Sequence, residues 1–197
     1  MKISLKAVPH ISSKIAIDLN KSGVVKMTQG LEPVIEEAGK ILLQSIHQEL
    51  DLEDKVDEIC EENEEEIEFM LADERQLFFM IKKKLAPEFG VILNYEERYS
   101  DISHKILDVL YNEDLIFYDV TENRIKNIIY NAITSFIADA SELEDAIMDK
   151  IRTYKKKYIP GTDEFDILYE KLYKEEIIKR GMQWWKKLGY ILKMGYF

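Results

Sequence analysis

The sequence contains little cysteine, glycine or proline and no long apolar run. Its 197 residues include one cysteine, eight glycines and four prolines. The single Cys60 cannot form an internal disulfide, which is typical of a reducing compartment. The low glycine and proline content excludes collagen-like and linker-rich classes. No stretch approaches the roughly 18 apolar residues of a membrane-spanning helix, and Lys6, Lys14 and Asp18 interrupt any leader-like core. We therefore expect a cytoplasmic protein.

The sequence also lacks the short motifs of common enzyme classes. It has no GxSxG, P-loop, GxGxxG or HExxH pattern, and its three histidines, His10, His47 and His104, show no nucleophile–base spacing. Cys60 stands at an apolar position among acidic residues, which raise the pKa of a thiol, so a core role is favoured over catalysis. We expect a non-enzymatic protein without a cofactor.

One short region is chemically varied enough to consider as a site. Arg98, Tyr99, Asp101 and His104 lie within seven residues, and an arginine–aspartate pair beside a histidine could orient a small anion. The alternative is a helix cap with a local ion pair. Asp101 and His104 also have the i, i+3 spacing of a metal-ligand pair, but an isolated pair of this kind is weak, so no metal site is expected.

The chain contains two similar segments about 90 residues apart. Residues 10–19 read HISSKIAIDL and residues 101–110 read DISHKILDVL, and a shift of 91 residues gives eleven identities between 10–86 and 101–177. Apolar positions also stay in register under this shift. The alternative is that two amphipathic helical stretches agree by chance. We predict an internal duplication, with a first helical repeat at 1–92, a second at 93–182 and a basic aromatic tail at 183–197.

The apolar residues recur at helical spacing, which predicts an all-α fold of two related helical bundles. Ile11, Ile15 and Leu19 are four residues apart, as are Ile102 and Ile106. The short apolar pieces at 23–25 and 115–118 are expected to be connectors or a pair of very short strands. The predicted helices are 9–22, 29–49, 52–69 and 73–86 in the first repeat, and 100–113, 121–139, 142–158 and 163–180 in the second.

Several phrases of the sequence resemble a known family. They are MKISLKAVPHISSKIAIDL at the start, ADERQLFFMIKKKLA, ERYSDISHKILDVLYNEDLI with ENRIKNIIYNAI, and KKKYIPGTDEFDILYEKLYKEEIIKRG. Over residues 1 to about 182 the chain is similar to an uncharacterised bacterial family, domain of unknown function number five hundred and seven. The resemblance implies a small bacterial helical protein and brings no activity with it.

The net charge of −11 is unevenly distributed. Residues 51–74 hold 13 acids and one base, whereas residues 150–197 hold 12 bases and 6 acids. Under the 91-residue shift, a glutamate run at 64–66 corresponds to a lysine run at 155–157. The two runs could face each other, face apart toward different partners, or simply be solvated. The predicted acidic interaction face is Glu61, Glu62, Glu64, Glu65 and Glu66, and the predicted basic interaction face is Lys155, Lys156, Lys157, Lys179 and Arg180.

These observations favour a protein-interaction or regulatory module whose partner is another protein. The alternative is nucleic-acid binding by the C-terminal region, where Tyr154, Tyr158, Trp184 and Trp185 accompany the lysines. The acidic net charge disfavours that alternative. Contact of the tail at 183–197 with a membrane surface is a further, weaker interpretation.

Overall fold

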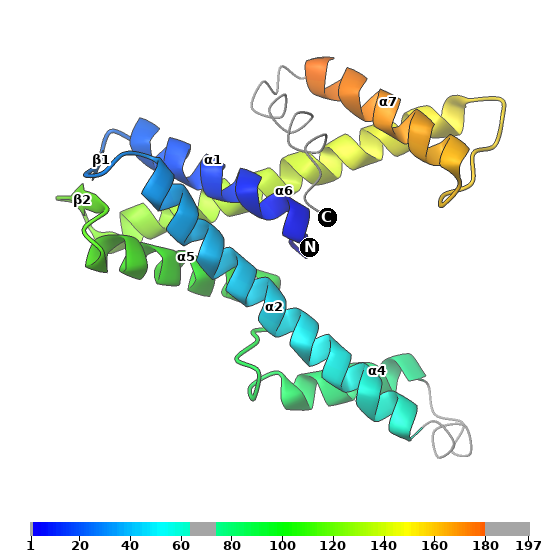
Figure 1. Ribbon diagram of the computed structural model, residues 1–197, viewed down its shortest axis with the longest axis horizontal. Helices are drawn as coiled ribbons and strands as arrows, with labels where there is room; N and C mark the ends of the chain where they lie inside the picture. The colour runs from blue at the N-terminus through cyan, green and yellow to red at the C-terminus, as the bar shows by residue number, and fades with distance from the viewer. Residues whose placement is uncertain (1, 64–73, 180–197) are drawn as a thin grey trace. The chain divides into compact units, whose positions relative to one another are not determined.

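The computed structural model describes residues 2–63 and 74–179, and Figure 1 labels their helices and strands. The chain divides into two compact units, residues 1–136 and 137–197, which are described separately. The described elements are the 3-10 helix η1 (Leu5–Ala7), α1 (Val8–Lys21), β1 (Val25–Met27), α2 (Glu32–Glu62), α4 (Glu74–Leu85), α5 (Tyr95–Asn112), β2 (Ile116–Tyr118), α6 (Glu122–Thr153) and α7 (Asp163–Lys179). The predicted predominance of helix is confirmed.

The core of the first unit consists of apolar stripes at four-residue spacing. On α1, Ile11, Ile15 and Leu19 are fully buried, and α1 packs against α2. Ile106 on α5 and Ile129 on α6 are equally buried. Burying a side chain of this size contributes about 1.5–3 kcal/mol, so these stripes are the main source of stability.

Two helices are longer than the sequence analysis predicts. The expected breaks near residues 50 and 140 are wrong, because α2 runs without interruption from Glu32 to Glu62 and α6 from Glu122 to Thr153. Neither break position has glycine or proline, and the buried stripe continues through Leu52 and Val56. Ser141, which has the spacing of a capping residue, lies inside α6 instead. A capping pattern therefore does not start a helix where the apolar stripe is continuous.

Two helices begin at capped residues. Asn94 precedes α5, and its side-chain oxygen accepts hydrogen bonds from the backbone N–H of Glu96 at 2.9 Å and Glu97 at 3.3 Å. Thr162 precedes α7, and its Oγ1 accepts from the N–H of Phe165 at 3.4 Å. These bonds satisfy donors that the first turn of a helix leaves without partners.

The two short apolar pieces form an antiparallel strand pair. Val25 pairs with Tyr118, Lys26 with Phe117 and Met27 with Ile116. Each strand follows a tight turn with a left-handed residue, Gly23 at φ 69° and Asp114 at φ 53°. The strand pair joins parts of the chain that are about 90 residues apart and fixes the ends of α1 and α5 near each other.

α4 packs against the C-terminal half of α2. Phe78, Ile81 and Leu85 of α4 pack against Leu52 and Val56 of α2. Cys60 also packs against this cluster and is only partly buried, so its place in a core is as expected. Among the described residues of the first unit, this α2–α4 pair bears the two large apolar side chains with the highest exposed fractions, Phe79 and Met80.

The second unit is described from residue 137 to 179. Leu143, Ile147 and Ile151 on α6 are buried, as are Phe165, Leu172 and Ile177 on α7. The buried carboxylate of Glu176 on α7 accepts a hydrogen bond from Nζ of Lys150 on α6 at 2.6 Å. Among the described residues of both units, no helix has the length and apolarity needed to cross a bilayer.

Candidate functional site

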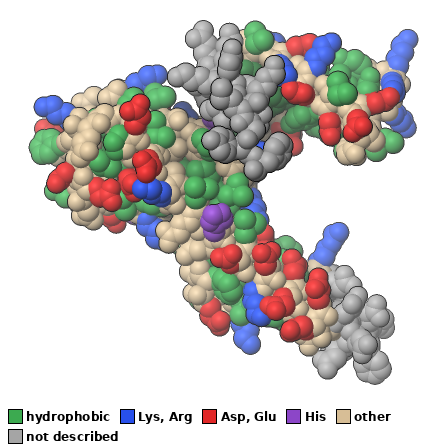
Figure 2. All heavy atoms as spheres, in the orientation of Figure 1, with side chains coloured by type: hydrophobic (Ala, Val, Ile, Leu, Met, Phe, Trp, Pro, Cys, Tyr) green, Lys and Arg blue, Asp and Glu red, His purple; other side chains and the backbone are tan. Residues whose placement is uncertain are grey.

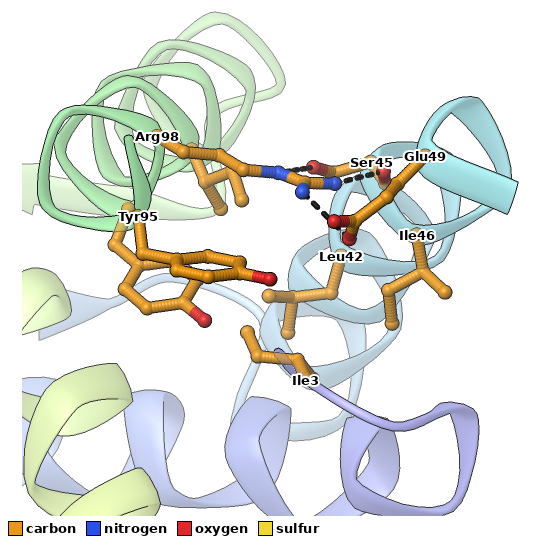
Figure 3. A pocket seen from close by; sticks show the side chains of 9 residues that line it. Ile3, Leu42, Ser45, Ile46, Glu49, Tyr95 and Arg98 are labelled. Atoms are coloured by element: carbon orange, nitrogen blue, oxygen red, sulfur yellow. Dashed lines mark hydrogen bonds and ion pairs between the residues drawn. The ribbon is translucent and has the colours of Figure 1, made fainter. Parts of the chain in front are cut away.

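A buried ion pair joins α2 to α5 in the first unit, and we call Arg98, Ser45 and Glu49 the Arg98 junction (Figure 3). Nη1 of Arg98 lies 2.7 Å from Oε2 of Glu49, and the two side chains are 7% and 5% exposed. Nε of Arg98 donates to Oγ of Ser45 at 3.1 Å, and Nη2 donates to the Ser45 carbonyl oxygen. The guanidinium is thus held by three acceptors and is committed to α2.

A second ion pair network surrounds the junction. Glu53, one turn after Glu49, accepts hydrogen bonds from Nζ of Lys2 and, at 2.7 Å, from Nζ of Lys82. Burial opposes ionisation of Glu53, but the two lysines outweigh it and lower the pKa of this carboxyl. Burial likewise acts to lower the pKa of Lys2, yet the hydrogen bond with Glu53 and the charge of Glu49 raise it. The network ties the N-terminus, α2 and α4 together.

Two tyrosines complete the surroundings of the junction. Tyr95 and Tyr99 are stacked with centroids 6.0 Å apart, and Figure 3 shows rings beside the guanidinium. Burial raises the pKa of both phenols, with Glu49 adding to the effect. The cavity among Ile3, Leu42 and these side chains encloses about 10 Å³, which is no larger than one water molecule. The junction is therefore built for packing and offers no room for a substrate.

The structure separates the four residues of the predicted polar cluster. Arg98 and Tyr99 are buried toward α2, whereas His104 is exposed. Asp101 forms an i, i+4 ion pair with Lys105 at 2.8 Å on the surface of α5. The residues share one helix but face different directions, so they do not converge on one ligand atom.

The sequence analysis did not identify the partners of Arg98. Ser45 and Glu49 are four residues apart on the buried face of α2, next to Ile46. A charged residue on an otherwise apolar helix stripe is the signal that could have indicated a buried partner. That partner is Arg98, which lies 49 residues after Glu49, and only tertiary packing brings the two together.

The predicted acidic face is described only in part. Glu61 and Glu62 are exposed at the C-terminal end of α2, whereas Glu64, Glu65 and Glu66 lie outside the described residues. Further exposed acids, Asp51, Asp54 and Asp57, precede them on the same helix, and Figure 2 shows acidic side chains gathered there. Together with Glu61 and Glu62 they form what we call the acidic face of α2.

The predicted basic face belongs to the second unit. Lys155, Lys156 and Lys157 are exposed in the segment after α6. Lys156 pairs with Glu164 and lies 5.4 Å from the ring centroid of Tyr158, and Lys179 lies 3.6 Å from Glu176. Arg180 lies outside the described residues. Residues 137–179 hold eight bases and 11 acids, a net charge of −3, so the lysines do not make this segment basic overall.

No group of three potential metal ligands occurs among the residues that the structure describes. Most carboxylates instead face solvent or pair with a lysine or arginine, as Glu53 does with Lys2 and Lys82. A diffuse row of helical acids also lacks the wrapped loop geometry that holds calcium.

An exposed apolar pair on α4 is a second feature that the sequence analysis did not identify as a surface. Phe79 and Met80 are 68% and 69% exposed, and the next turn carries the exposed Lys83 and Lys84. We call these four residues the α4 face. Phe78 and Ile81 pack on α2, and the ring of Phe79 meets the ring of Phe78 edge-on with centroids 6.0 Å apart. α4 thus packs one side on α2 and leaves Phe79 and Met80 on the other side exposed.

Comparison with known proteins gives a family and no activity. The family model described as protein of unknown function (DUF507) matches residues 1–182, and the chain belongs to this family. A search of curated proteins finds no match.

Proposed function

We propose that this DUF507 member is a non-enzymatic adaptor in the bacterial cytoplasm that binds another protein through the α4 face. The structure has no evident substrate cavity at its most polar buried site, because the Arg98 junction is filled by its own side chains. Its distinctive surface is instead the α2–α4 pair, which presents an apolar and basic side on α4 and an acidic side on α2.

An internal duplication is part of this proposal, and the element bounds support it. A shift of 91 residues carries α1 (Val8–Lys21) onto residues 99–112 of α5, and α2 (Glu32–Glu62) onto residues 123–153 of α6. The same shift carries β1 onto β2, and these strands pair antiparallel about the Lys26–Phe117 pair. Such a register is what a two-fold relation between two copies produces.

The observation that carries the proposed function is the exposure of Phe79 and Met80. The residues 91 positions later, on α7, are Glu170 and Lys171. These form ordinary i, i+4 ion pairs, Glu170 with Lys174 and Lys171 with Glu175. At these two positions one copy has ion-paired side chains, whereas the other exposes two large apolar side chains, and aromatic residues and methionine are enriched in protein interfaces.

The acidic face of α2 supports the same interpretation. Its carboxylates, among them Glu61 and Glu62, lie toward the C-terminus of α2, and the last turn of α2 has no basic residue. Negative charge at this end opposes the helix dipole and is mildly destabilising, by about 0.3–1 kcal/mol per charge. A partner that brings positive charge would offset that cost.

The nucleic-acid alternative has less support. Bases in the second unit, such as Lys150, Lys156 and Lys174, are paired with acids, and residues 137–179 carry a net charge of −3. Phosphate binding would require these bases to give up their carboxylates, while the remaining acids repel the polyanion.

Site-specific photo-crosslinking in bacterial cells tests the proposal. Phe79→p-benzoylphenylalanine places the reactive group on the α4 face, and Glu170→p-benzoylphenylalanine is the matched control on α7. We expect a discrete protein adduct from position 79 that position 170 does not give. Phe79→Glu/Met80→Lys, which copies the residues of α7, should abolish capture of that adduct's partner while leaving thermal unfolding nearly unchanged, since exposed substitutions cost about 0.5 kcal/mol or less.

Equal adducts from both positions would contradict the assignment of the α4 face. So would a double variant that still captures the partner with unchanged yield. Repeating the capture at high salt separates the two contributions, because ionic contacts of Lys83 and Lys84 weaken with salt whereas apolar contacts of Phe79 and Met80 do not.

A further inference from the structure

An aromatic corner at the end of α5 carries a second binding surface in the first unit. We propose that Tyr111 and Tyr118, flanked by Asp108 and Glu122, bind a lysine or arginine side chain from a basic segment of a protein partner. We call these four residues the tyrosine corner. It is separate from the α4 face and would recognise the opposite charge.

The corner offers the exposed ring of Tyr111 beside the half-buried ring of Tyr118. Their centroids are 5.5 Å apart with an interplanar angle of 49°, and Tyr111 is 53% exposed. A tilted pair of this kind presents ring faces to a side chain that approaches from solvent. Ammonium and guanidinium groups are attracted to such faces, and the attraction grows when an anion lies beside the ring.

Carboxylates on two elements supply that negative charge. Asp108 lies one turn before Tyr111 on α5, and Glu122 begins α6. Burial raises the pKa of the Tyr118 phenol, and Glu122, Tyr111 and Asp108 raise it further, so both acids act on the same ring. The last turn of α5 has no basic residue, which leaves the negative end of its dipole uncompensated.

Acids outnumber bases around the corner. Residues 108–124 hold five acids and one base, Arg124, and Lys26 pairs with Phe117 on the neighbouring strand. Lys105 forms its ion pair with Asp101, and Lys126 lies 6.0 Å from the ring centroid of Tyr130. The corner is therefore an aromatic surface with an excess of negative charge. Charge complementarity favours a cationic occupant over an acidic or purely apolar one.

The duplication in the proposed function sharpens this assignment. Counting back 91 residues from Asp108, Tyr111, Tyr118 and Glu122 gives Ile17, Asn20, Met27 and Leu31. The first copy thus has neither an aromatic pair nor an acid at these positions. At the adjoining turn the first copy has Gly23 at positive φ, and the second has Asp114 in the same region, where an aspartate is less favourable than glycine. The second copy has acquired acidic and aromatic character at one exposed corner.

The experiment is an NMR titration of the full chain, labelled with ¹⁵N, using an N-acetylated hexa-arginine amide as the probe. We expect the amide shifts of residues 108–122 to move in a saturable way, and binding to weaken as salt is raised. Tyr111→Asn, which copies the first copy's residue, should weaken binding about fivefold. Asp108→Asn/Glu122→Gln should weaken it by a similar factor.

The matched control is Asp54→Asn/Asp57→Asn, which removes the same charge from the acidic face of α2. If the control weakens binding as much as the corner variant, the probe binds by net charge alone and the proposal is overturned. Absence of saturable shifts at 108–122 at 50 mM salt also overturns it. Tetramethylammonium at equal cation concentration should bind more weakly than the peptide; equal or tighter binding would assign the corner to a free quaternary amine and refute the peptide assignment.

These results are distinguishable from a failure of the proposed function. The peptide titration needs no α4 contact, so Phe79→Glu/Met80→Lys should leave it unchanged. Conversely, the corner variants should leave the photo-crosslink at position 79 unchanged unless both surfaces bind one partner.

Discussion

Replacement of Arg98 by methionine isolates the contribution of the Arg98 junction to the stability of the first unit. Arg98→Met keeps most of the side-chain volume but removes every donor that Glu49 and Ser45 now accept from. The carboxylate of Glu49 then stays on the buried face of α2 with 5% of its side chain exposed. An ionised group in such a place must become protonated, admit water or unfold its surroundings.

The expected loss follows from the burial of both partners. Removing one member of a buried pair costs about 3–5 kcal/mol because the other charge is left without a partner. Replacing both charges with apolar side chains of similar size is neutral or stabilising in such cases. We therefore expect Arg98→Met to destabilise by about 3 kcal/mol or more, and Arg98→Met/Glu49→Leu to recover most of this loss.

Urea unfolding monitored by circular dichroism measures the stability of the single and double variants. Amide hydrogen exchange at α5 reports the local loss of stability. The double-mutant cycle gives the coupling between the two positions, which should exceed about 2 kcal/mol for a desolvated pair. The matched control is Lys40→Met, since Lys40 pairs with Glu36 at 3.0 Å on the surface with both side chains more than half exposed. A loss below about 1 kcal/mol for Arg98→Met, equal to that of the control, would refute a buried pair at this junction.

Three other measurements test separate parts of the structure. The pKa of Glu53 is lowered from 4.5, so its contribution to stability is present above about pH 4.5 and is lost as pH falls through the lowered pKa; the difference between wild type and Glu53→Gln in urea should vanish below that range. Burial lowers the pKa of His10 below 6.5, so an NMR titration of its ring protons should give a midpoint under that value, and its contribution to stability should be lost as pH falls through the midpoint. Ile106 is fully buried, and Ile106→Ala should cost about 2–5 kcal/mol in thermal or urea unfolding, whereas a cost under 1 kcal/mol would contradict its place in the core.

The sequence predicts the helices of this protein because their burial is periodic. Ile11 and Ile15 are four residues apart, as are Ile102 and Ile106, and all four are buried as expected. The turn at Gly161 and the cap at Asn94 are equally local, since each depends on a few neighbouring residues. Local chemistry of this kind is readable without tertiary contacts.

Helix length and side-chain partners were less predictable. Polar residues near 50 and 141 suggested breaks, yet packing along a continuous apolar stripe kept α2 and α6 whole. Arg98 could be identified as chemically unusual, but its partner Glu49 could not, because the crossing of α5 over α2 selects it. Phe79 and Phe78 are adjacent aromatic residues with opposite surroundings, one exposed and one packed on α2. Whether an aromatic residue is core or surface depends here on which side of α4 has a neighbour.

The Arg98 junction also restricts which helix surfaces of two similar halves can pack together. Counting 91 residues from the junction gives Ala7 for Arg98, Phe136 for Ser45 and Ala140 for Glu49. Phe136 is buried and stacks with His10 at 6.4 Å, so the related position on α6 is filled by an aromatic ring. The junction thus joins Arg98 of the second repeat to Ser45 and Glu49 of the first, and the reciprocal positions hold Ala7, Phe136 and Ala140. α2 packs on both α1 and α5, and its contact with α5 is the one that gives Glu49 its cation. In related helices a buried polar residue can specify register at some expense of stability. If the halves are two copies, as we propose, the exposed Phe79 and Tyr111 also differ from their counterparts Glu170 and Asn20, and differences at exposed positions can change partners without changing the core.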